Sequence, residues 1–178
     1  MYEINPYDLH FSTTNGSGYD IACAGSNSAL TYQVFENIPE VKKINWSPIF
    51  KDEILFVFLK KKQKSNLEVK RFKELKKDPD LISRISSITK EIIHSKTIEE
   101  FEYLLDEHEA ITGQYIKSET VKSKYFSDYE GSVKSLGAWG GDFVLATREN
   151  KNYFLDKGFN TILSYSELIK ESTFKTVF

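Results

Sequence analysis

A short, almost uninterrupted run of apolar residues at Glu53–Leu59 (EILFVFL) constrains the fold of this chain more than any other feature. A run of this length predicts a strand that is covered on both faces. Such coverage requires a packed core, and the chain can form one, because it has 178 residues, of which 40% are hydrophobic and 14% aromatic. We therefore expect one ordered domain, or slightly more, that contains this strand.

Helix-start patterns recur after the apolar run. They are Ser65 with Glu68, Asp78 followed by Pro79, and Thr97 with Glu100. A hydroxyl or carboxylate before a helix accepts hydrogen bonds from its first free N–H groups, and proline fits the first turn. The first pattern predicts a helix that runs to about Lys76. Apolar residues at helical spacing follow the other two patterns, which predicts two amphipathic helices.

Shorter segments complete the expected fold. Residues 1–28 are expected to form a loop with one helical stretch near Tyr19–Ala24. Further strands are expected at Ala29–Val34, Val41–Trp46, Val133–Ala138, Asp142–Thr147 and Thr161–Leu163, and short helices at Lys151–Asp156 and Ser166–Lys170. This order of elements predicts an α+β fold, with a mainly antiparallel sheet and helices packed on one side.

Composition excludes several classes of protein. The formal net charge of −2 gives no support to a nucleic acid as partner. The single cysteine, Cys23, excludes an internal disulfide and a multi-cysteine zinc site, and it fits a reducing cytoplasm. The three histidines lack metal-ligand spacing, so no metal site is expected. The N-terminus is too polar for a signal peptide, and no apolar run is long enough to span a membrane.

Gly16–Ala22 (GSGYDIA) is the first segment whose residues suit chemistry. Its two glycines permit backbone conformations that other residues avoid, and they can bring N–H groups close to an anion. Asp20 stands where this loop would enter a short helix, and its carboxylate could accept a proton from a substrate hydroxyl. The alternative is a structural turn in which Asp20 caps the helix after Gly18.

A second glycine-rich segment, Lys134–Asp142 (KSLGAWGGD), lies between two expected strands. Three glycines in five positions require either tight turns or the close approach of a ligand. The segment matches neither a dinucleotide-binding fingerprint nor a Walker loop. The alternative is a hairpin with a glycine bulge, for which Gly140-Gly141 would be sufficient.

Lysines cluster directly after the apolar run, in the segment Lys60–Ser65. Lysines at the end of a strand can bind a substrate phosphate or carboxylate as point charges. The alternative is a solvated run of charge, with Ser65 serving only as the cap of the following helix.

Taken together, the two glycine segments resemble motifs of the GHMP kinases, the superfamily of galactokinase, homoserine kinase, mevalonate kinase and phosphomevalonate kinase. In that family a G-S-G-x-D-[VI]-A segment supplies the catalytic aspartate of several members, and Gly16–Ala22 matches it at every position. A later motif, K-x-[TS]-G-A-G-G-G, is similar to Lys134–Gly141, which departs from it at Leu136 and Trp139. The whole pattern looks most like a bacterial branch called the GYDIA-type GHMP kinases.

This resemblance implies a division of the chain and a set of site residues. Residues 1–50 would be a remnant of the family's N-terminal domain, and residues 51–178 its ferredoxin-like C-terminal domain. With ATP and Mg²⁺ as cofactors, the enzyme would phosphorylate a hydroxyl or phosphate of a mevalonate-like metabolite, and Asp20 would be its catalytic base. The implied substrate-binding residues are Ser17, Gly18, Lys61, Gln63, Ser65 and Trp139, and the residues near the transferred phosphate are Lys134, Gly137, Ala138, Gly140 and Gly141.

One family motif has no counterpart in these 178 residues. GHMP kinases hold the ATP phosphates on a P-x-x-x-G-L-G-S-S-A loop and on the helix that follows it, and no such segment occurs here. We therefore expect this chain to be inactive alone, as a fragment, a truncated reading frame or one half of a split enzyme. Strands without their natural neighbours would favour self-association or binding of the missing N-terminal segment.

Trp139 would narrow the glycine loop, where it would stack on a substrate, plug the site or pack over the sheet. The alternative function is a non-catalytic metabolite-binding or interaction domain that keeps the kinase scaffold.

Overall fold

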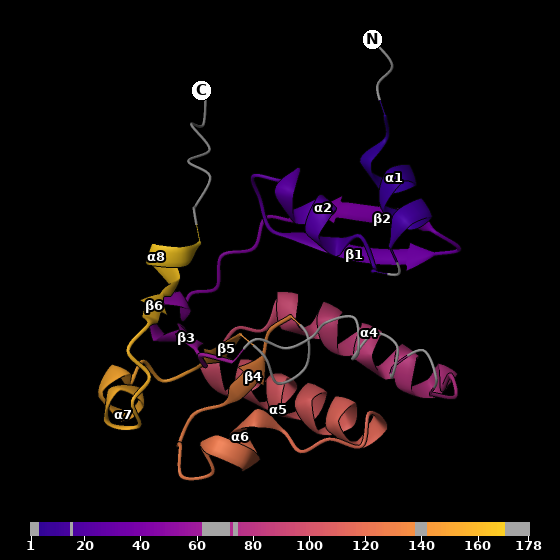
Figure 1. Cartoon of the computed structure of the whole chain (residues 1–178). Helices are drawn as coiled ribbons and strands as arrows, with labels where there is room; N and C mark the ends of the chain where they lie inside the picture. The colour runs from indigo at the N-terminus through magenta and orange to yellow at the C-terminus, as the bar shows by residue number, and fades with distance from the viewer. Residues whose placement is uncertain (1–3, 15, 62–71, 73–74, 138–141, 170–178) are drawn as a thin grey trace, which may run out of the picture. The chain divides into compact units, whose positions relative to one another are not determined.

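The computed structural model describes residues 4–14, 16–61, 72, 75–137 and 142–169 (Figure 1). They form two compact units, one within Met1–Trp46 and one at Ser47–Ile169. Each unit contains its own antiparallel sheet. Over the described ranges, no helix has both the length and the apolar character needed to cross a bilayer.

The first unit contains two short helices and a β-hairpin. Helix α1 (Pro6–Thr13) begins after Asn5, whose side chain caps its first turn. Helix α2 is Tyr19–Ala24, as the sequence predicts. Strands β1 (Leu30–Phe35) and β2 (Ile38–Lys43) pair antiparallel across a tight turn at residues 36–37.

Two expectations for this unit are wrong. Residues 6–13 form α1 and not a loop; because α1 buries no residue, no apolar periodicity marks it in the sequence. Strand β2 begins earlier than the expected Val41–Trp46 and includes Pro39. Proline is tolerated there because each strand of a two-stranded sheet has an open edge, where no N–H is needed for pairing.

The second unit is built on a four-stranded sheet. Its strands are β3 (Leu55–Phe58), β4 (Val133–Ser135), β5 (Phe143–Ala146) and β6 (Ile162–Ser164). Its helices are η1 (Lys51–Glu53, a 3₁₀-helix), α4 (Pro79–His94), α5 (Ile98–Tyr115), α6 (Val121–Tyr125), α7 (Lys151–Asp156) and α8 (Tyr165–Leu168). The strand order is β4-β5-β3-β6, and every neighbouring pair is antiparallel.

Strands and helices of this unit follow the β-α-β-β-α-β order of the ferredoxin-like fold. Helices α4 to α6 connect β3 to β4, a hairpin joins β4 to β5, and α7 connects β5 to β6. Helices α4 and α5 lie side by side (Figure 1). The expected fold class, α+β with an antiparallel sheet, is therefore confirmed.

The apolar run supplies the interior strand β3, which pairs with β5 on one side and β6 on the other. Leu55 and Val57 of this strand are completely buried. They pack in one core with side chains from the other strands and from the helical segments, namely Val121, Phe126, Val133, Val144, Ala146 and Phe154. Removal of this apolar surface from water is the main stabilising contribution to the unit.

Two of the three predicted helix starts are confirmed. The Asp78 side chain accepts hydrogen bonds from the N–H groups of Asp80 and Leu81, both at 3.1 Å. The Thr97 hydroxyl accepts one from the N–H of Glu100 at 3.2 Å. The helix predicted from Ser65 lies almost entirely outside the described residues. Helix α6 is a short element for which the sequence analysis made no prediction.

Candidate functional site

The segment Gly16–Ala22 forms a tight turn that leads into α2. Gly18 is the N-cap residue of this helix, and its φ of +77° lies in the left-handed region. A Cβ at Gly18 would also lie 3.1 Å from Tyr32 Oη and 3.3 Å from Phe11 Cζ. Any other residue here would meet both backbone strain and crowding, so the turn itself requires this glycine.

Ser17 and Tyr32 hold the turn against the hairpin of the same unit. The Tyr32 hydroxyl donates a hydrogen bond to the Ser17 carbonyl at 2.5 Å. The Ser17 hydroxyl accepts a hydrogen bond from the N–H of Tyr19 at 3.3 Å. The rings of Tyr19 and Tyr32 pack edge to face, with centroids 5.7 Å apart. A hydrogen bond with Cys23, together with burial, raises the pKa of Tyr19 to about 12.

Asp20 is the second residue of α2 and is exposed. Its carboxylate forms no hydrogen bond or ion pair within the described part of the chain. The cap position of α2 belongs to Gly18, so the alternative in which Asp20 caps this helix is wrong. The carboxylate is therefore free to accept a hydrogen bond or a proton from a ligand.

In the second unit, the lysine segment and the glycine segment meet at one end of the sheet. The backbone of Asp142 accepts a hydrogen bond from Leu59 N at 2.7 Å and donates one to the Lys61 carbonyl at 2.9 Å. Leu136 N donates to the Phe143 carbonyl at 3.0 Å. These bonds extend β3, β5 and β4 to the same end, so the structure brings together two segments that the sequence analysis singled out separately.

Gly137 opens the glycine turn with a φ of +67°, in the left-handed region. A Cβ at Gly137 would meet nothing within 4 Å, so the backbone conformation and not space requires a glycine there. Strands β4 and β5 on either side form a hairpin, as the structural alternative for this segment states. The next four residues of the turn, Ala138, Trp139, Gly140 and Gly141, lie outside the described residues.

The ammonium of Lys61 contacts Tyr125. Lys61 Nζ donates a hydrogen bond to the Tyr125 hydroxyl at 2.5 Å and lies 4.1 Å from the centre of the ring. This contact lowers the pKa of Tyr125. Lys60 Nζ donates to the carbonyl of Gly158 at 2.9 Å. Both lysines that the structure describes in this cluster therefore bind groups of the fold itself. Gln63 and Ser65 lie outside the described residues.

Lys134, on β4, is bound by two side chains of α5. Its Nζ lies 3.0 Å from Glu109 Oε1 and 3.0 Å from His108 Nδ1. The side chain of Lys134 is 18% exposed and that of Glu109 is 4% exposed. Two charges this deeply buried require each other, because either one alone would carry a large desolvation cost.

His108 is neutral beside this ion pair. Burial, with a smaller effect from the Lys134 ammonium, lowers the pKa of His108 to about 4. An ammonium group can only donate hydrogen bonds, so His108 Nδ1 is the acceptor and the ring proton lies on Nε2. At neutral pH this histidine therefore acts as a second ligand of Lys134 and not as a competing positive charge.

Sequence reasoning missed Asp142, Tyr125 and Glu109. Asp142 has a signal in the sequence, because it directly follows the Gly140-Gly141 pair. Tyr125 and Glu109 have no such signal, since they meet their lysines across long stretches of sequence.

Within the described ranges, no group of three or more His, Cys, Asp or Glu residues gathers closely enough to hold a metal ion.

The predicted site residues that the structure describes fall into both units. Ser17, Gly18 and Asp20 belong to the first, and Lys61, Lys134 and Gly137 belong to the second. Their assignment to one common site stays a prediction.

The fold is similar to two solved structures. A Lin0012 protein from Listeria innocua aligns with a TM-score of 0.55 and 19% identity, over 70% of this chain and 41% of that protein. Mevalonate kinase from Methanococcus jannaschii aligns with a TM-score of 0.55 and 21% identity, over 74% of this chain and 45% of the kinase. No protein-family profile matches the chain, and no curated protein sequence matches it.

These similarities define a class of fold. The chain has an α+β fold similar to that of mevalonate kinase. It spans less than half the length of either solved structure. At this level of identity the similarity shows the fold alone.

Proposed function

We propose that this chain is the C-terminal part of an ATP-dependent GHMP-type kinase, and that the kinase phosphorylates a hydroxyl or phosphate of a mevalonate-like metabolite. The fold similarity to the mevalonate kinase of Methanococcus jannaschii supports this class of reaction. The match of Gly16–Ala22 to the family's aspartate motif supports it independently.

The observation that carries the proposal is the exposed, unpartnered carboxylate of Asp20 after a glycine-dependent turn. A carboxylate that is exposed and has no partner in the protein is available to a ligand, and its place directly after a turn that requires glycine supports a role in binding or proton transfer. Asp20 has neither a hydrogen-bond donor nor a cation beside it in the described part of the chain. In the proposed reaction Asp20 accepts the proton of the substrate hydroxyl, which makes the oxygen a better nucleophile.

The described residues do not by themselves fit ATP and Mg²⁺. Lys134 and Lys61 are the candidate phosphate ligands, but their ammonium groups bind Glu109 and Tyr125. No described cluster of carboxylates suits a cation. The 178 residues also contain no P-x-x-x-G-L-G-S-S-A segment. The proposal therefore assigns the binding of nucleotide to residues outside these 178, on the same chain or on another one.

Substitution of Asp20 by asparagine tests the proposal in the assembled enzyme, that is, this chain together with the segment that supplies the phosphate loop. Asp20→Asn keeps the shape of the side chain and removes the proton acceptor. We expect kcat to fall by about 10²–10⁴-fold, with KM nearly unchanged, in an assay of ADP release with mevalonate-like hydroxy acids. A variant with kcat within a few-fold of the wild type would remove Asp20 from catalysis.

A second candidate function is a non-catalytic metabolite-binding or interaction domain. The internal partners of Lys61 and Lys134 favour it, because a phosphate-binding lysine is normally open to its ligand. Calorimetry separates the two functions. The metabolite-binding domain would bind a mevalonate-like acid as tightly without ATP as with it, whereas the kinase requires the phosphate loop before nucleotide binds.

A further inference from the structure

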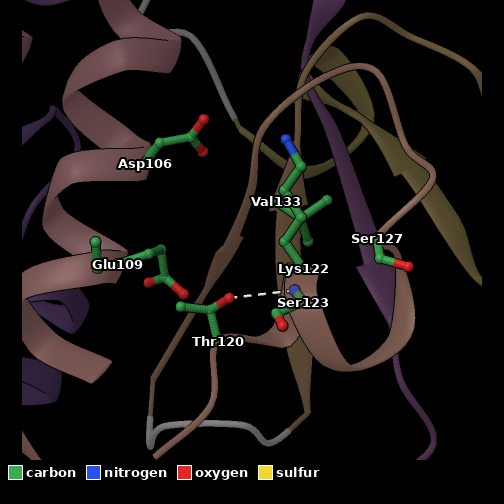
Figure 2. Close-up of a pocket in the computed structure, with 8 residues that line it drawn as sticks. Asp106, Glu109, Thr120, Lys122, Ser123, Ser127 and Val133 are labelled. Carbon is green, nitrogen blue, oxygen red and sulfur yellow. Dashed lines mark hydrogen bonds between the residues drawn. The ribbon is translucent and has the colours of Figure 1, made fainter. Parts of the chain in front are cut away.

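A pocket of about 330 Å³ lies in the second unit between α5, α6 and β4 (Figure 2). Its polar groups are held largely by the protein itself. The Glu109 carboxylate binds Lys134 and is approached by the N–H and hydroxyl of Ser135. The Thr120 hydroxyl accepts a hydrogen bond from Ser123 N at 3.1 Å, the dashed line in Figure 2. These groups do not require a ligand. Unpaired main-chain groups occur instead in the first unit, along the edges of the β1–β2 hairpin.

Each strand of this hairpin has one side that pairs with the other strand and one side that faces away from it. In an antiparallel pair, hydrogen-bonded pairs of residues alternate with non-hydrogen-bonded pairs, whose N–H and C=O groups point outward. The hydrogen bond from Ile44 N to the Ala29 carbonyl, at 2.9 Å, marks residues 29 and 44 as a hydrogen-bonded pair. By alternation, the pairs that point outward are Leu30 with Lys43, Tyr32 with Val41, and Val34 with Pro39.

The turn of the hairpin fixes the same alternation independently. Glu36 and Asn37 both have positive φ, of +49° and +64°, which is the type I′ geometry of a two-residue hairpin turn. Such a turn closes on a hydrogen-bonded pair, which is Phe35 with Ile38 here. Steps of two residues from this pair lead back to residues 29 and 44, so the two ends of the hairpin agree.

The outward side of β2 is poorly suited to pairing with another strand. Pro39 has no N–H to donate, and it stands at one of the outward-pointing positions. Glu40, Lys42 and Lys43 add charges along the same strand. Proline and lysine are residues by which natural edge strands avoid pairing with another chain. This edge is therefore protected.

The outward side of β1 has no such protection. Residues 29–35 contain no proline and no charged side chain. The outward-pointing residues are Leu30, Tyr32 and Val34, and their main-chain groups have no hydrogen-bond partner in the described part of the chain. An unpaired, uncharged edge of this kind is a template for one more strand.

The first unit also lacks the burial that a sheet needs. A two-stranded sheet is at best marginally stable, whereas three or more strands with an apolar face reach independent stability. Of the residues described in this unit, Gly18 and Ala22 alone are buried. A further strand beside β1 would therefore stabilise the unit as well as satisfy its open edge.

Strand β1 is complementary to itself. When a second β1 runs antiparallel beside the first, with a two-fold axis at Tyr32, Leu30 lies opposite Val34 of the second copy. Tyr32 then lies opposite Tyr32, so every outward-pointing residue meets another outward-pointing residue. Thr31 lies opposite Gln33, so no like charges face each other. Both copies use the same surface, as a closed two-fold dimer requires.

We propose that β1 pairs antiparallel with β1 of a second copy of this chain, which makes one four-stranded sheet in the order β2-β1-β1-β2. The proposal goes beyond the kinase function and does not depend on it, because it follows from the hydrogen-bond pattern and the charges of the hairpin.

Val34 and Val41 provide a matched test of the two edges. Each is 38% exposed, and each stands at an outward-pointing position, one on β1 and one on β2. Proline at either position removes an outward N–H and leaves the hydrogen bonds between β1 and β2 in place. In sedimentation equilibrium the wild type should form a dimer. Val34→Pro should weaken this dimer about tenfold or more, because one hydrogen bond is lost from each copy. Val41→Pro should dimerise like the wild type.

A pair of charges tests the register. In the proposed dimer, Thr31→Glu/Gln33→Lys places a carboxylate opposite an ammonium at two symmetric positions. Opposite charges on facing residues stabilise a pair of strands, so the dimer should tighten by a few-fold to about tenfold. Within the hairpin the same two substitutions face Lys42 and Glu40, which also favours folding.

Three results would overturn the proposal: a wild type that stays monomeric, equal association of the two proline variants, or no tightening by the charge pair. Circular dichroism checks that each variant is folded. If Val34→Pro does not fold, the charge pair still decides the question, because it leaves every main-chain donor in place.

Discussion

Gly18 determines whether the turn before Asp20 can form. Its left-handed backbone and its contacts with Tyr32 and Phe11 leave no room for a side chain. We expect Gly18→Ala to destabilise the first unit by about 1–2 kcal/mol from the backbone alone, with the crowding adding to this. Urea unfolding followed by circular dichroism would measure the loss.

Gly25, at the opposite end of the same helix, provides the matched control. It has an ordinary φ of −86°, and a Cβ there would lie 3.4 Å from the Ile21 carbonyl, a normal contact. Gly25→Ala should therefore be nearly neutral. Equal losses in the two variants would contradict the described turn.

His108 gives the protein a specific dependence on pH. Its folded pKa is lowered from 6.5 to about 4, mainly by burial. The unfolded chain therefore binds a proton more readily, and stability falls as the pH decreases from about 6.5 to 4. At 1.36 kcal/mol per pKa unit the loss is at most about 3 kcal/mol, and the partial exposure of the ring reduces it.

The variant His108→Asn isolates this effect. Asparagine offers an acceptor oxygen to Lys134 but does not titrate, so the variant should lose less stability than the wild type between pH 6.5 and 4. The raised pKa of Glu109 acts in the opposite direction, but it is present in both proteins and largely cancels in the comparison. Parallel stability curves for the two proteins would exclude a buried, neutral His108.

Individual residues of the two glycine segments were predictable where the local backbone conformation requires one residue type. Gly18 and Gly137 stand at positive φ, and their place in short polar segments signals that requirement. The position of Asp20 at the start of α2, directly after such a turn, was predictable, and its role in a site stays a prediction. The partners Tyr125 and Glu109 were not predictable, because they are fixed by tertiary packing between segments that are distant in the sequence.

At the level of helices, local hydrogen bonding makes α4 predictable. Asp78 accepts two N–H groups at its first turn, each at 3.1 Å. Asp78→Ala should cost about 1 kcal/mol, measured as a shift of the urea midpoint. Asp78→Asn should be nearly neutral, since asparagine caps as well as aspartate. If Asp78→Ala is also neutral, the cap does not contribute to the stability of this helix.

Elements without such signals were predicted less well. Helix α1 buries nothing and therefore has no apolar stripe. Strand β2 contains Pro39, which normally argues against a strand. By contrast β3 was predicted correctly from its continuous apolar run, and α4 and α5 from apolar residues at helical spacing.

At the scale of the whole molecule, the ferredoxin-like order of strands was predictable only through the family resemblance. Which strands become neighbours depends on contacts between distant segments, and the hydrophobic pattern of one sequence does not encode them uniquely. The assignment of the two units to the two domains of a kinase stays a prediction.

The β1–β2 hairpin leads us to expect self-association. Phe35 and Ile38 face each other across its end, and each is 70% exposed. A two-stranded sheet is marginally stable alone, and open strand edges with apolar side chains favour pairing with another chain. We expect the average mass in sedimentation equilibrium to rise with protein concentration.

The double variant Phe35→Lys/Ile38→Lys should remain a monomer, because like charges at the edge oppose pairing. Ile49→Lys, at an isolated residue that is 85% exposed in the second unit, is the control and should associate like the wild type. A wild-type chain that stays monomeric at every concentration would show that the hairpin does not drive association.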